Sequence, residues 1–278
     1  MRAKTVNLET NYLQKMKNAG SVSIHAVTAL DEYGQSCTVQ VAGEIPLTLI
    51  VDDREIVTLM TLGSHVEALA VGYLRNHFII KKLREIQSVQ LNLESKTVKV
   101  NTFDGVGGKR MVPCTITAGC GQGAVLSVDK LPDTHLSNAT IKQSLIYGLL
   151  HTLAQRNNIH RQAGGVHGCA LCQGAEVLAF VEDVGRHNAT DAVAGLMWLH
   201  NWAGDDKIFY TTGRLTSEMV MKVAHTGIPI LLSRSGVTHK SIQIAQKLGM
   251  TLIAHAKGQH FLIFNGENNV IFDACPLE

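Results

Sequence analysis

The chain has 278 residues, of which 45% are hydrophobic and 17% are charged, enough to bury a substantial core and to favour a division into two domains. Lys and Arg number 25 against 23 Asp and Glu, so the formal charge is +2. So small an excess argues against a general nucleic-acid or membrane-surface binder, and any anion site must therefore be local.

The N-terminal segment 1–20 contains basic residues but no apolar run behind them, unlike a secretory signal. No stretch of about 20 apolar residues follows that could span a bilayer. We therefore expect a cytoplasmic protein with neither a membrane nor a nucleic acid among its partners.

The first part of the chain is predicted to be rich in β-strands. Residues 21–61 read as a small sheet because apolar residues alternate or run together between Gly and Asp breaks. Residues 64–78 have helical periodicity, and Ser64 with Glu67 matches a capping box. Further strands are expected within residues 88–93, 97–103 and 110–117.

From about Ser137 the pattern changes to alternating helices and strands, which favours a mostly parallel sheet covered by helices. We therefore expect a smaller β-rich N-terminal domain over residues 1–128 and an α/β domain over residues 129–278. The expected helices are 138–156, 189–202, 216–227 and 238–249, and the expected strands are 176–183, 207–213, 228–233, 251–256 and 260–264.

Three turns in the second domain place a glycine and an arginine between a strand and a helix, the first helix with Asn188 as its expected N-cap. Free N–H groups, the helix dipole and a guanidinium all favour phosphate there, and such turns meet beyond the carboxyl ends of parallel strands. We predict a site for a phosphorylated or pyrophosphate-bearing ligand. Alternatively, each arginine pairs with a nearby acid such as Glu182, Asp183 or Glu218. The turns contain Gly185, Arg186 and His187; Gly213 and Arg214; and Arg234, Ser235 and Gly236.

Cysteines raise a separate question, because six of them in so large a chain favour free thiols in a reducing compartment. Cys120 lies among Gly119, Gly121 and Gly123, which would give a thiolate access and freedom to move between a donor and an acceptor. The alternative is a small buried residue in a glycine turn. The other cysteines stand at positions 37, 114, 169, 172 and 275.

Cys169 and Cys172 form a CxxC pair. In a strand the two thiols would face opposite sides of the sheet, whereas in a tight turn they could supply half of a zinc site. We favour strand packing and predict no metal site. Together with the H-x-E of residues 65–67, the pair imitates a zinc-dependent nucleobase deaminase, but no proline precedes Cys169 and the two halves lie in different expected domains.

Several further segments form a recognisable set: LAVGYL at 69–74, Cys120-Gly121, GGVH at 164–167, EDVGRHNATD at 182–191, GRLTSEMVMK at 213–222, GIPILLSRS at 227–235 and LGMTLIAHAKG at 248–258. This set resembles the formate dehydrogenase accessory sulfurtransferase family, FdhD. It covers most of the chain, and its EDVGRHN block is highly specific.

The resemblance implies a sulfurtransferase that takes persulfide sulfur from a cysteine desulfurase. It would pass this sulfur to molybdenum in the bis(molybdopterin guanine dinucleotide) cofactor, carried as cargo before insertion into formate dehydrogenase. It also implies a cytidine-deaminase-like three-layer αβα fold for the larger domain, and a homodimer. The persulfide would form on Cys120. The segment similar to the family's cofactor-binding stretch is His255, Ala256, Lys257, Gly258, Gln259 and His260.

The chain departs from the family pattern at several positions. Gly123 replaces a second loop cysteine, so Cys169 or Cys172 could substitute for it, or transfer could be lost. Lys257 replaces the usual arginine, and His77 stands where the family often has glycine, while Ala192 replaces a frequent lysine. These changes suggest a divergent branch, serving formate dehydrogenase or a related molybdenum or tungsten enzyme.

The leading hypothesis is therefore a sulfur carrier with Cys120 as nucleophile. The alternatives are a chaperone that binds the molybdenum cofactor without transferring sulfur, and a zinc-dependent hydrolase of the deaminase type.

Overall fold

The computed structural model describes residues 23–105, 114–116 and 136–275 of the chain. Cys120 and the glycines around it lie outside these residues, as does the expected domain boundary after residue 128. Both therefore stay predictions.

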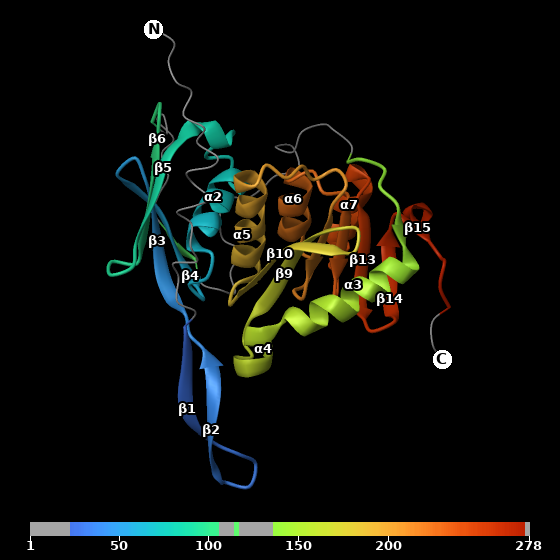
Figure 1. The fold of residues 1–278 in the computed structure, drawn as a ribbon, viewed down its shortest axis with the longest axis horizontal. Helices are drawn as coiled ribbons and strands as arrows, with labels where there is room; N and C mark the ends of the chain where they lie inside the picture. Colours follow the sequence, from blue (N-terminus) through green and yellow to red (C-terminus); the bar gives the residue numbers. More distant parts are fainter. Residues whose placement is uncertain (1–22, 106–113, 117–135, 276–278) are drawn as a thin grey trace.

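The first part of the chain forms a five-stranded mixed sheet with the strand order β5-β6-β3-β4-β7 (Figure 1). The β3–β6 and β4–β7 pairs are parallel and the others antiparallel. On β3, Leu47, Leu49 and Val51 alternate with less buried residues, so that one face of the strand joins the core. The strands are β3 (Ile45–Val51), β4 (Arg54–Thr61), β5 (Ile86–Asn92), β6 (Thr97–Thr102) and β7 (Cys114–Ile116), with the 3-10 turn η1 (Leu83–Glu85) before β5.

The prediction of a single sheet over residues 21–61 is wrong at its beginning. Strands β1 (Ile24–Leu30) and β2 (Ser36–Ala42) form their own two-stranded sheet, an arm that projects from the body (Figure 1). The arm is closed at its base, where Gly43 N–H donates to the Ser23 carbonyl at 2.8 Å. A Cβ on Gly43 would lie 2.2 Å from Ser23 Oγ, so a larger residue at this position would require the serine side chain to move.

The second part of the chain forms a six-stranded sheet with the order β10-β9-β11-β12-β13-β14. Parallel pairing is confined to β11–β12 and β12–β13, and the other three pairs are antiparallel, so the sheet is mixed rather than mostly parallel. The reason is two short hairpins, which turn at Gly174 and Gly258 with positive φ and reverse the chain. The strands are β9 (His167–Gln173), β10 (Glu176–Asp183), β11 (Ile208–Thr211), β12 (Ile230–Ser233), β13 (Thr251–Lys257) and β14 (His260–Asn265); β8 (Ile141–Lys142) and β15 (Val270–Ile271) form a separate parallel pair.

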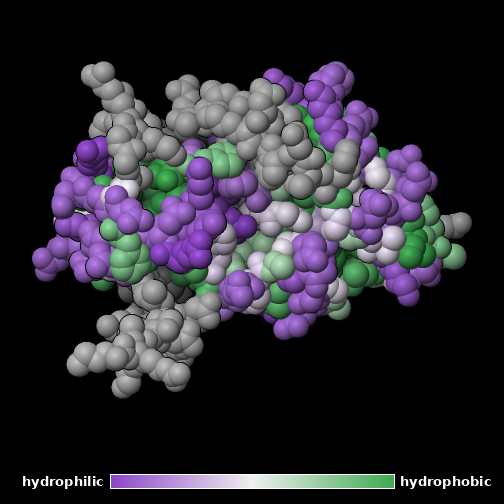
Figure 2. Space-filling view, turned by 90° about the horizontal axis from the view of Figure 1, so that it is seen from above, coloured by the Kyte–Doolittle hydropathy of each residue, from purple (hydrophilic) through white to green (hydrophobic). Residues whose placement is uncertain are grey.

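Helices cover both faces of the six-stranded sheet, with α3 on one face and α5, α6 and α7 on the other (Figure 1). The chain therefore belongs to the α/β class, as predicted. Hydrophilic residues occupy most of the described surface seen from above (Figure 2), and no helix in the described ranges is long and apolar enough to cross a membrane. The helices are α2 (Val66–Asn76), α3 (Gln143–Arg156), α4 (Asn158–Ala163), α5 (Arg186–Leu199), α6 (Ser217–His225) and α7 (His239–Leu248), with the 3-10 turn η3 (Glu267–Asn269).

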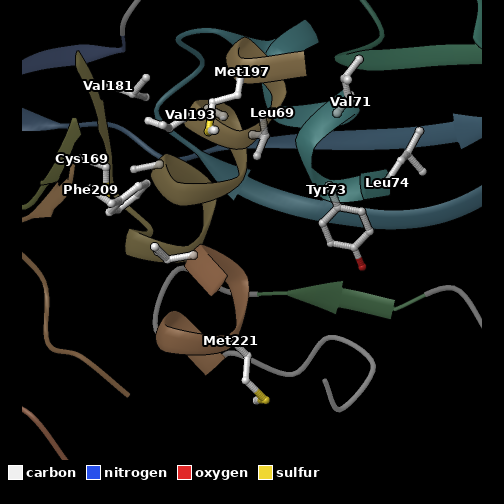
Figure 3. Close-up of a cluster of buried hydrophobic side chains, with 14 of the residues drawn as sticks. Leu69, Val71, Tyr73, Leu74, Cys169, Val181, Val193, Met197, Phe209 and Met221 are labelled. Carbon is white, nitrogen blue, oxygen red and sulfur yellow. The ribbon is translucent and has the colours of Figure 1, made fainter. Parts of the chain in front are cut away.

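Helices α2 and α5 join the two sheets through an unusually close crossing. A Cβ on Gly72 would lie 1.7 Å from the Asp191 carbonyl oxygen, and one on Gly195 would lie 1.9 Å from the Ala68 carbonyl oxygen. Large apolar side chains such as Leu69 surround this crossing and form a continuous core (Figure 3). Two glycines thus let the backbones touch where the two parts of the molecule meet.

The predicted capping box of α2 does not form. The N-cap is His65, in a left-handed conformation at φ 51°, and it makes no side-chain cap hydrogen bond. Ser64 instead donates from Oγ to the Glu182 carbonyl oxygen at 3.0 Å, because the start of α2 is tied to β10. A long-range contact has replaced the local one.

Candidate functional site

The carboxyl ends of four strands meet at one edge of the six-stranded sheet. β11, β12 and β13 are parallel, and β10 has the same direction because β9 is antiparallel to both β10 and β11. Beyond these ends, Arg234 N–H donates to the Thr211 carbonyl at 3.0 Å and His255 N–H donates to the Ser235 carbonyl at 2.9 Å. The arginine turns therefore lie side by side along the edge at which open sheets bind ligands.

Arg186 and Arg214 come together at the N-terminal end of α5. Arg186 is the first residue of this helix and is only 9% exposed. A Cβ on Gly213 would lie 3.0 Å from Arg186 Cβ, so a side chain at this position of the second turn would crowd the arginine. Burial lowers the pKa of Arg186, and the nearby charge of the exposed Arg214 lowers it further.

Local acids do not hold these arginines in ion pairs. The Glu182 carboxylate accepts from the backbone N–H groups of Ile159 at 3.0 Å and His160 at 2.9 Å, at the start of α4. Within the described residues, the ion pairs of this region involve Lys222 and His187 and no arginine. The described residues therefore contain no ion pair between these arginines and Glu182, Asp183 or Glu218.

Asp183 serves as a joint between the two sheets. Its carboxylate accepts hydrogen bonds from the Thr61 hydroxyl, from Leu62 N–H at 3.1 Å, from Gly185 N–H at 2.9 Å and from the Asn188 amide at 3.0 Å. Burial raises the pKa of Asp183, and these hydrogen bonds lower it. Asn188 was expected to be the N-cap of α5, but Gly185 holds that position. Asn188 lies inside the helix, and its amide donates to Asp183 and to the Met60 carbonyl.

Asp191 forms a second joint, in the middle of three helices. It accepts from the Asn76 amide of α2 at 2.8 Å and from Lys222 Nζ of α6 at 2.7 Å. The side chains of Asp191 and Lys222 are each only 2% exposed. A buried pair of this kind depends on both partners, because either charge alone would be left without compensation.

The first turns of α5 and α6 hold a histidine and a carboxylate near this pair. His187 Nδ1 lies 3.7 Å from Glu218 Oε1, and Lys222 Nζ lies 3.8 Å from the same oxygen. Burial lowers the pKa of His187 to about 2, with further lowering by the charges of Lys222 and Arg186, so the imidazole is neutral. Burial raises the pKa of Glu218.

Several buried polar atoms around this point have no hydrogen-bond partner within the described residues. They include Arg186 Nε and His187 Nδ1 at the start of α5, and both ring nitrogens of His77 at the end of α2. Lys222 and His187 both lower the pKa of His77, after burial, which places the three side chains close together. Since buried polar groups are normally paired, such a concentration is typical of a site that binds a polar ligand.

Arg234 and Ser235 share the edge but lie apart from the Arg186–Arg214 pair. Arg234 is exposed, and its charge acts to lower the pKa of Tyr210, which burial raises to about 12. Tyr210 belongs to the core on the α3 side of the sheet. Of the three predicted arginines, Arg186 and Arg214 therefore lie close together, and Arg234 lies nearer to Tyr210.

The predicted cofactor segment 255–260 comprises the end of β13, the turn at Gly258 and Gln259, and the first residue of β14. His255 is exposed and lies beside the third turn, since a Cβ on Gly236 would be 3.3 Å from its ring. Ala256 is 1% exposed and packs in the core, so its side chain cannot contact a ligand at the edge. The remaining members of the segment are exposed, namely Lys257, Gly258, Gln259 and His260.

Cys169 and Cys172 both lie in β9 and are fully buried, on opposite faces of the sheet as the strand interpretation predicted. Burial raises the pKa of Cys169 to about 11 and that of Cys172 to about 12, so neither thiol is poised to ionise. No group of three or more His, Cys, Asp or Glu side chains in the described ranges is arranged to hold a metal ion.

Sequence reasoning did not find the long-range partners of this site. Thr61, Asn76 and Lys222 meet Asp183 or Asp191 across large separations in the chain. His167 also lies near the pair, because Arg186 and Arg214 lower its pKa after burial. The only sequence signals were the place of His167 in the GGVH segment and that of Lys222 at the end of GRLTSEMVMK, whereas Thr61 and Asn76 had none.

Comparisons with known proteins agree on one family. The family model described as FdhD/NarQ matches residues 42–271. A sulfur carrier protein FdhD from Listeria innocua is 33% identical over 237 residues, which cover 81% of this chain and 89% of the relative. One from Bacillus subtilis is 30% identical over 226 residues, covering 80% and 86%.

A solved structure gives the same result. It is described as a proposed formate dehydrogenase accessory protein from Desulfotalea psychrophila, and it superimposes with a TM-score of 0.75 at 26% identity. The superposition covers 90% of this chain and 99% of the other.

Proposed function

The chain belongs to the FdhD/NarQ family, and on that basis we propose that it is a sulfur carrier that loads molybdenum with sulfur. It accepts persulfide sulfur from a cysteine desulfurase on Cys120. It then passes the sulfur to the bis(molybdopterin guanine dinucleotide) cofactor, held as cargo for formate dehydrogenase or a related enzyme. The names of the curated relatives support the sulfur-carrier role.

One observation carries the cargo part of the proposal: Arg186 is buried at the start of α5, next to Arg214, and its Nε has no hydrogen-bond partner among the residues that the structure describes. A guanidinium and free N–H groups at a helix N-terminus suit the pyrophosphate of a guanine dinucleotide. Ser235, His255 and Lys257, farther along the same edge, would extend contact with so large a ligand. The resident residues bind and orient the cargo, and the cargo itself supplies the metal.

The sulfur step needs only one thiolate on this chain. The Cys120 thiolate attacks the terminal sulfur of the desulfurase persulfide, the S–S bond of the donor breaks, and the donor cysteine leaves as a thiolate. Cys120 then holds the sulfur as its own persulfide. A second loop cysteine is not required, so Gly123 is compatible with the transfer.

Chain connectivity supports a meeting of Cys120 with the cargo site. β7 is parallel to β4, with Ile116 opposite Leu59. β4 ends at Thr61, whose hydroxyl donates to Asp183 just before α5. Cys120 follows Ile116 by four residues, a span of at most about 14 Å. This short connection is the reason that the proposal pairs the Cys120 thiol with a ligand at the start of α5.

The test is the intact mass of the protein after anaerobic incubation with a cysteine desulfurase and cysteine. We expect the wild type to gain one sulfur that reductant removes, and Cys120→Ala to gain none. Cys37→Ala is the matched control, because Cys37 is exposed and should not affect loading. Loading that survives Cys120→Ala would refute the assignment of this residue.

A second candidate is a chaperone that holds the cofactor without transferring sulfur, motivated by Gly123 in place of the second loop cysteine. Wild-type protein that binds guanosine diphosphate but never accepts sulfur from an active desulfurase would select it. The zinc-hydrolase alternative has no donor set among the described residues. A homodimeric state and a cytoplasmic location belong to the proposal as well.

A further inference from the structure

The arm formed by β1 and β2 projects from the body and exposes apolar side chains (Figure 1). Four of the nine large apolar side chains that are exposed among the described residues belong to this short arm. They are Val27 at 38%, Val39 at 39%, Leu30 at 71% and Tyr33 at 79%. A two-stranded hairpin on its own is at best marginally stable in water, so the described residues leave the arm short of packing contacts.

One face of the arm is almost entirely apolar, because paired residues of an antiparallel sheet point to the same side. This valine face consists of Val27 opposite Val39, Ala29 opposite Cys37, and His25 opposite Val41. The other face carries Ala42, which packs at the base of the arm with Leu62 and Val166. The valine face is thus turned away from the contact that anchors the arm to the body.

The arm also lacks the features that normally keep strand edges from pairing with another chain, namely charged residues, proline and bulges. Residues 24–30 and 36–42 contain no Asp, Glu, Lys, Arg or Pro, and their seven pairs follow one another in an unbroken register. The other four hairpins of the described residues, β3–β4, β5–β6, β9–β10 and β13–β14, each contain a register shift. The arm is therefore built differently from the hairpins of the body.

We infer that the arm is a contact between two copies of this chain, in which the valine faces of the two arms pack on each other about a two-fold axis. A two-fold contact requires a surface that is complementary to itself. An uncharged face of small and β-branched residues meets this condition, because no like charges come together when it meets its copy. A face that recognises a different protein normally carries charged groups that select the partner.

This inference rests on the homodimeric state that belongs to the proposed function, and it specifies where the two copies touch. The family model begins at residue 42, so the arm precedes the residues that match it. The contact is therefore argued from this chain's own N-terminal strands and does not follow from the family match.

Sedimentation velocity at a series of protein concentrations tests the inference. The wild type should sediment as two chains. Val39→Asp should raise the dissociation constant of the dimer by at least about 100-fold, because the two-fold axis brings two carboxylates into one apolar contact. Thr38→Asp, at an exposed position on the opposite face of the same strand, is the matched control and should sediment like the wild type.

A cross-link on the wild type gives a second readout, which does not depend on the folding of a variant. Cys37 is exposed and lies in the valine face. A bis-maleimide should therefore join two copies through Cys37, as identified by peptide mass. The cross-link should be lost in Val39→Asp and kept in Thr38→Asp.

Three outcomes would overturn the inference. They are a wild-type protein that is monomeric throughout, a Val39→Asp variant that associates as tightly as the wild type, and a Thr38→Asp variant that dissociates as readily as Val39→Asp. The last would show that any charge on the arm acts and that the valine face has no special part. Sulfur loading is measured separately by intact mass, so its absence would refute the proposed function while normal sedimentation left the arm contact standing.

Discussion

The stretch 182–191 contains two kinds of buried polar residue, and the difference between them separates structure from function. Asp183 and Asp191 have their oxygens paired, one with the end of β4 and the other with α2 and α6. Arg186 and His187, between them in the sequence, keep polar atoms without partners in the described residues. One set holds the elements together, and the other set is left for a ligand.

The specificity of a motif therefore does not make every residue in it a ligand. Glu182, Asp183 and Asp191 form polar contacts with α4, β4, α2 and α6. These contacts fix the position of the first turn of α5. Arg186 is buried, yet its Nε has no hydrogen-bond partner within the described part of the chain. Changes to the paired residues should therefore affect stability, and changes to the unpaired ones should affect binding.

The largest effect should follow from Lys222→Met, which breaks the paired set. Asp191 would be left as a buried carboxylate without its cation, and breaking a buried pair in this way costs about 3–5 kcal/mol. The free energy of unfolding, measured in urea, should fall by this amount. Lys240→Met, at an exposed position of α7, is the matched control and should change it little.

Adding Asp191→Asn to Lys222→Met should recover part of the loss, because the orphan charge disappears. If Lys222→Met alone stays within about 1 kcal/mol of the wild type, the joint at Asp191 does not stabilise the fold.

The next largest effect should follow from Gly72→Ala at the crossing of α2 and α5. The new Cβ would lie 1.7 Å from a backbone oxygen of Asp191, and the helices would have to separate. We expect a loss of about 2–3 kcal/mol in the free energy of unfolding, typical of overpacking. The measurement is again a urea titration, with guanosine diphosphate binding as a second readout.

Gly148→Ala is its control within a helix. This exposed position of α3 has nothing within 4 Å of an added Cβ, so alanine should be neutral or stabilising by up to about 1 kcal/mol. Equal effects at both positions would show that helix propensity, rather than the close crossing, governs Gly72.

Local sequence patterns predicted most elements of the fold but not how the elements meet. The patterns of residues 189–202 and 216–227 found α5 and α6, although α6 packs one apolar face on the sheet and α5 is buried between the sheet and α2. The mixed sheet was missed because the direction of β9 depends on a hairpin turn at Gly174, which no hydrophobic pattern encodes.

The site was predictable to a similar degree. The arginine turns stood out because glycine, arginine and a helix start recur after successive strands. The long-range hydrogen bonds of Asp183 and Asp191 did not stand out, because Thr61 and Asp183 are 122 residues apart and Asn76 and Asp191 are 115 apart. No property of an isolated Thr or Asn distinguishes such a partner from a surface residue.

The smallest effect on stability should follow from Arg186→Gln, which changes the unpaired set. Because Arg186 Nε has no partner within the described residues and the arginine takes part in no ion pair there, its loss should alter the free energy of unfolding by less than about 1 kcal/mol. Pyrophosphate binding should nevertheless weaken by about 10- to 100-fold, since hydrogen bonds between charged groups contribute about 1.5–3 kcal/mol. Arg186→Lys should bind pyrophosphate with an affinity between those of the wild type and Arg186→Gln, because lysine keeps the charge but loses the planar fork. Arg84→Gln, an exposed change in η1, is the control for both measurements. A large loss of stability in Arg186→Gln would show that this arginine stabilises the fold, as Asp183 and Asp191 do. The distinction between paired and unpaired residues would then no longer mark the ligand site.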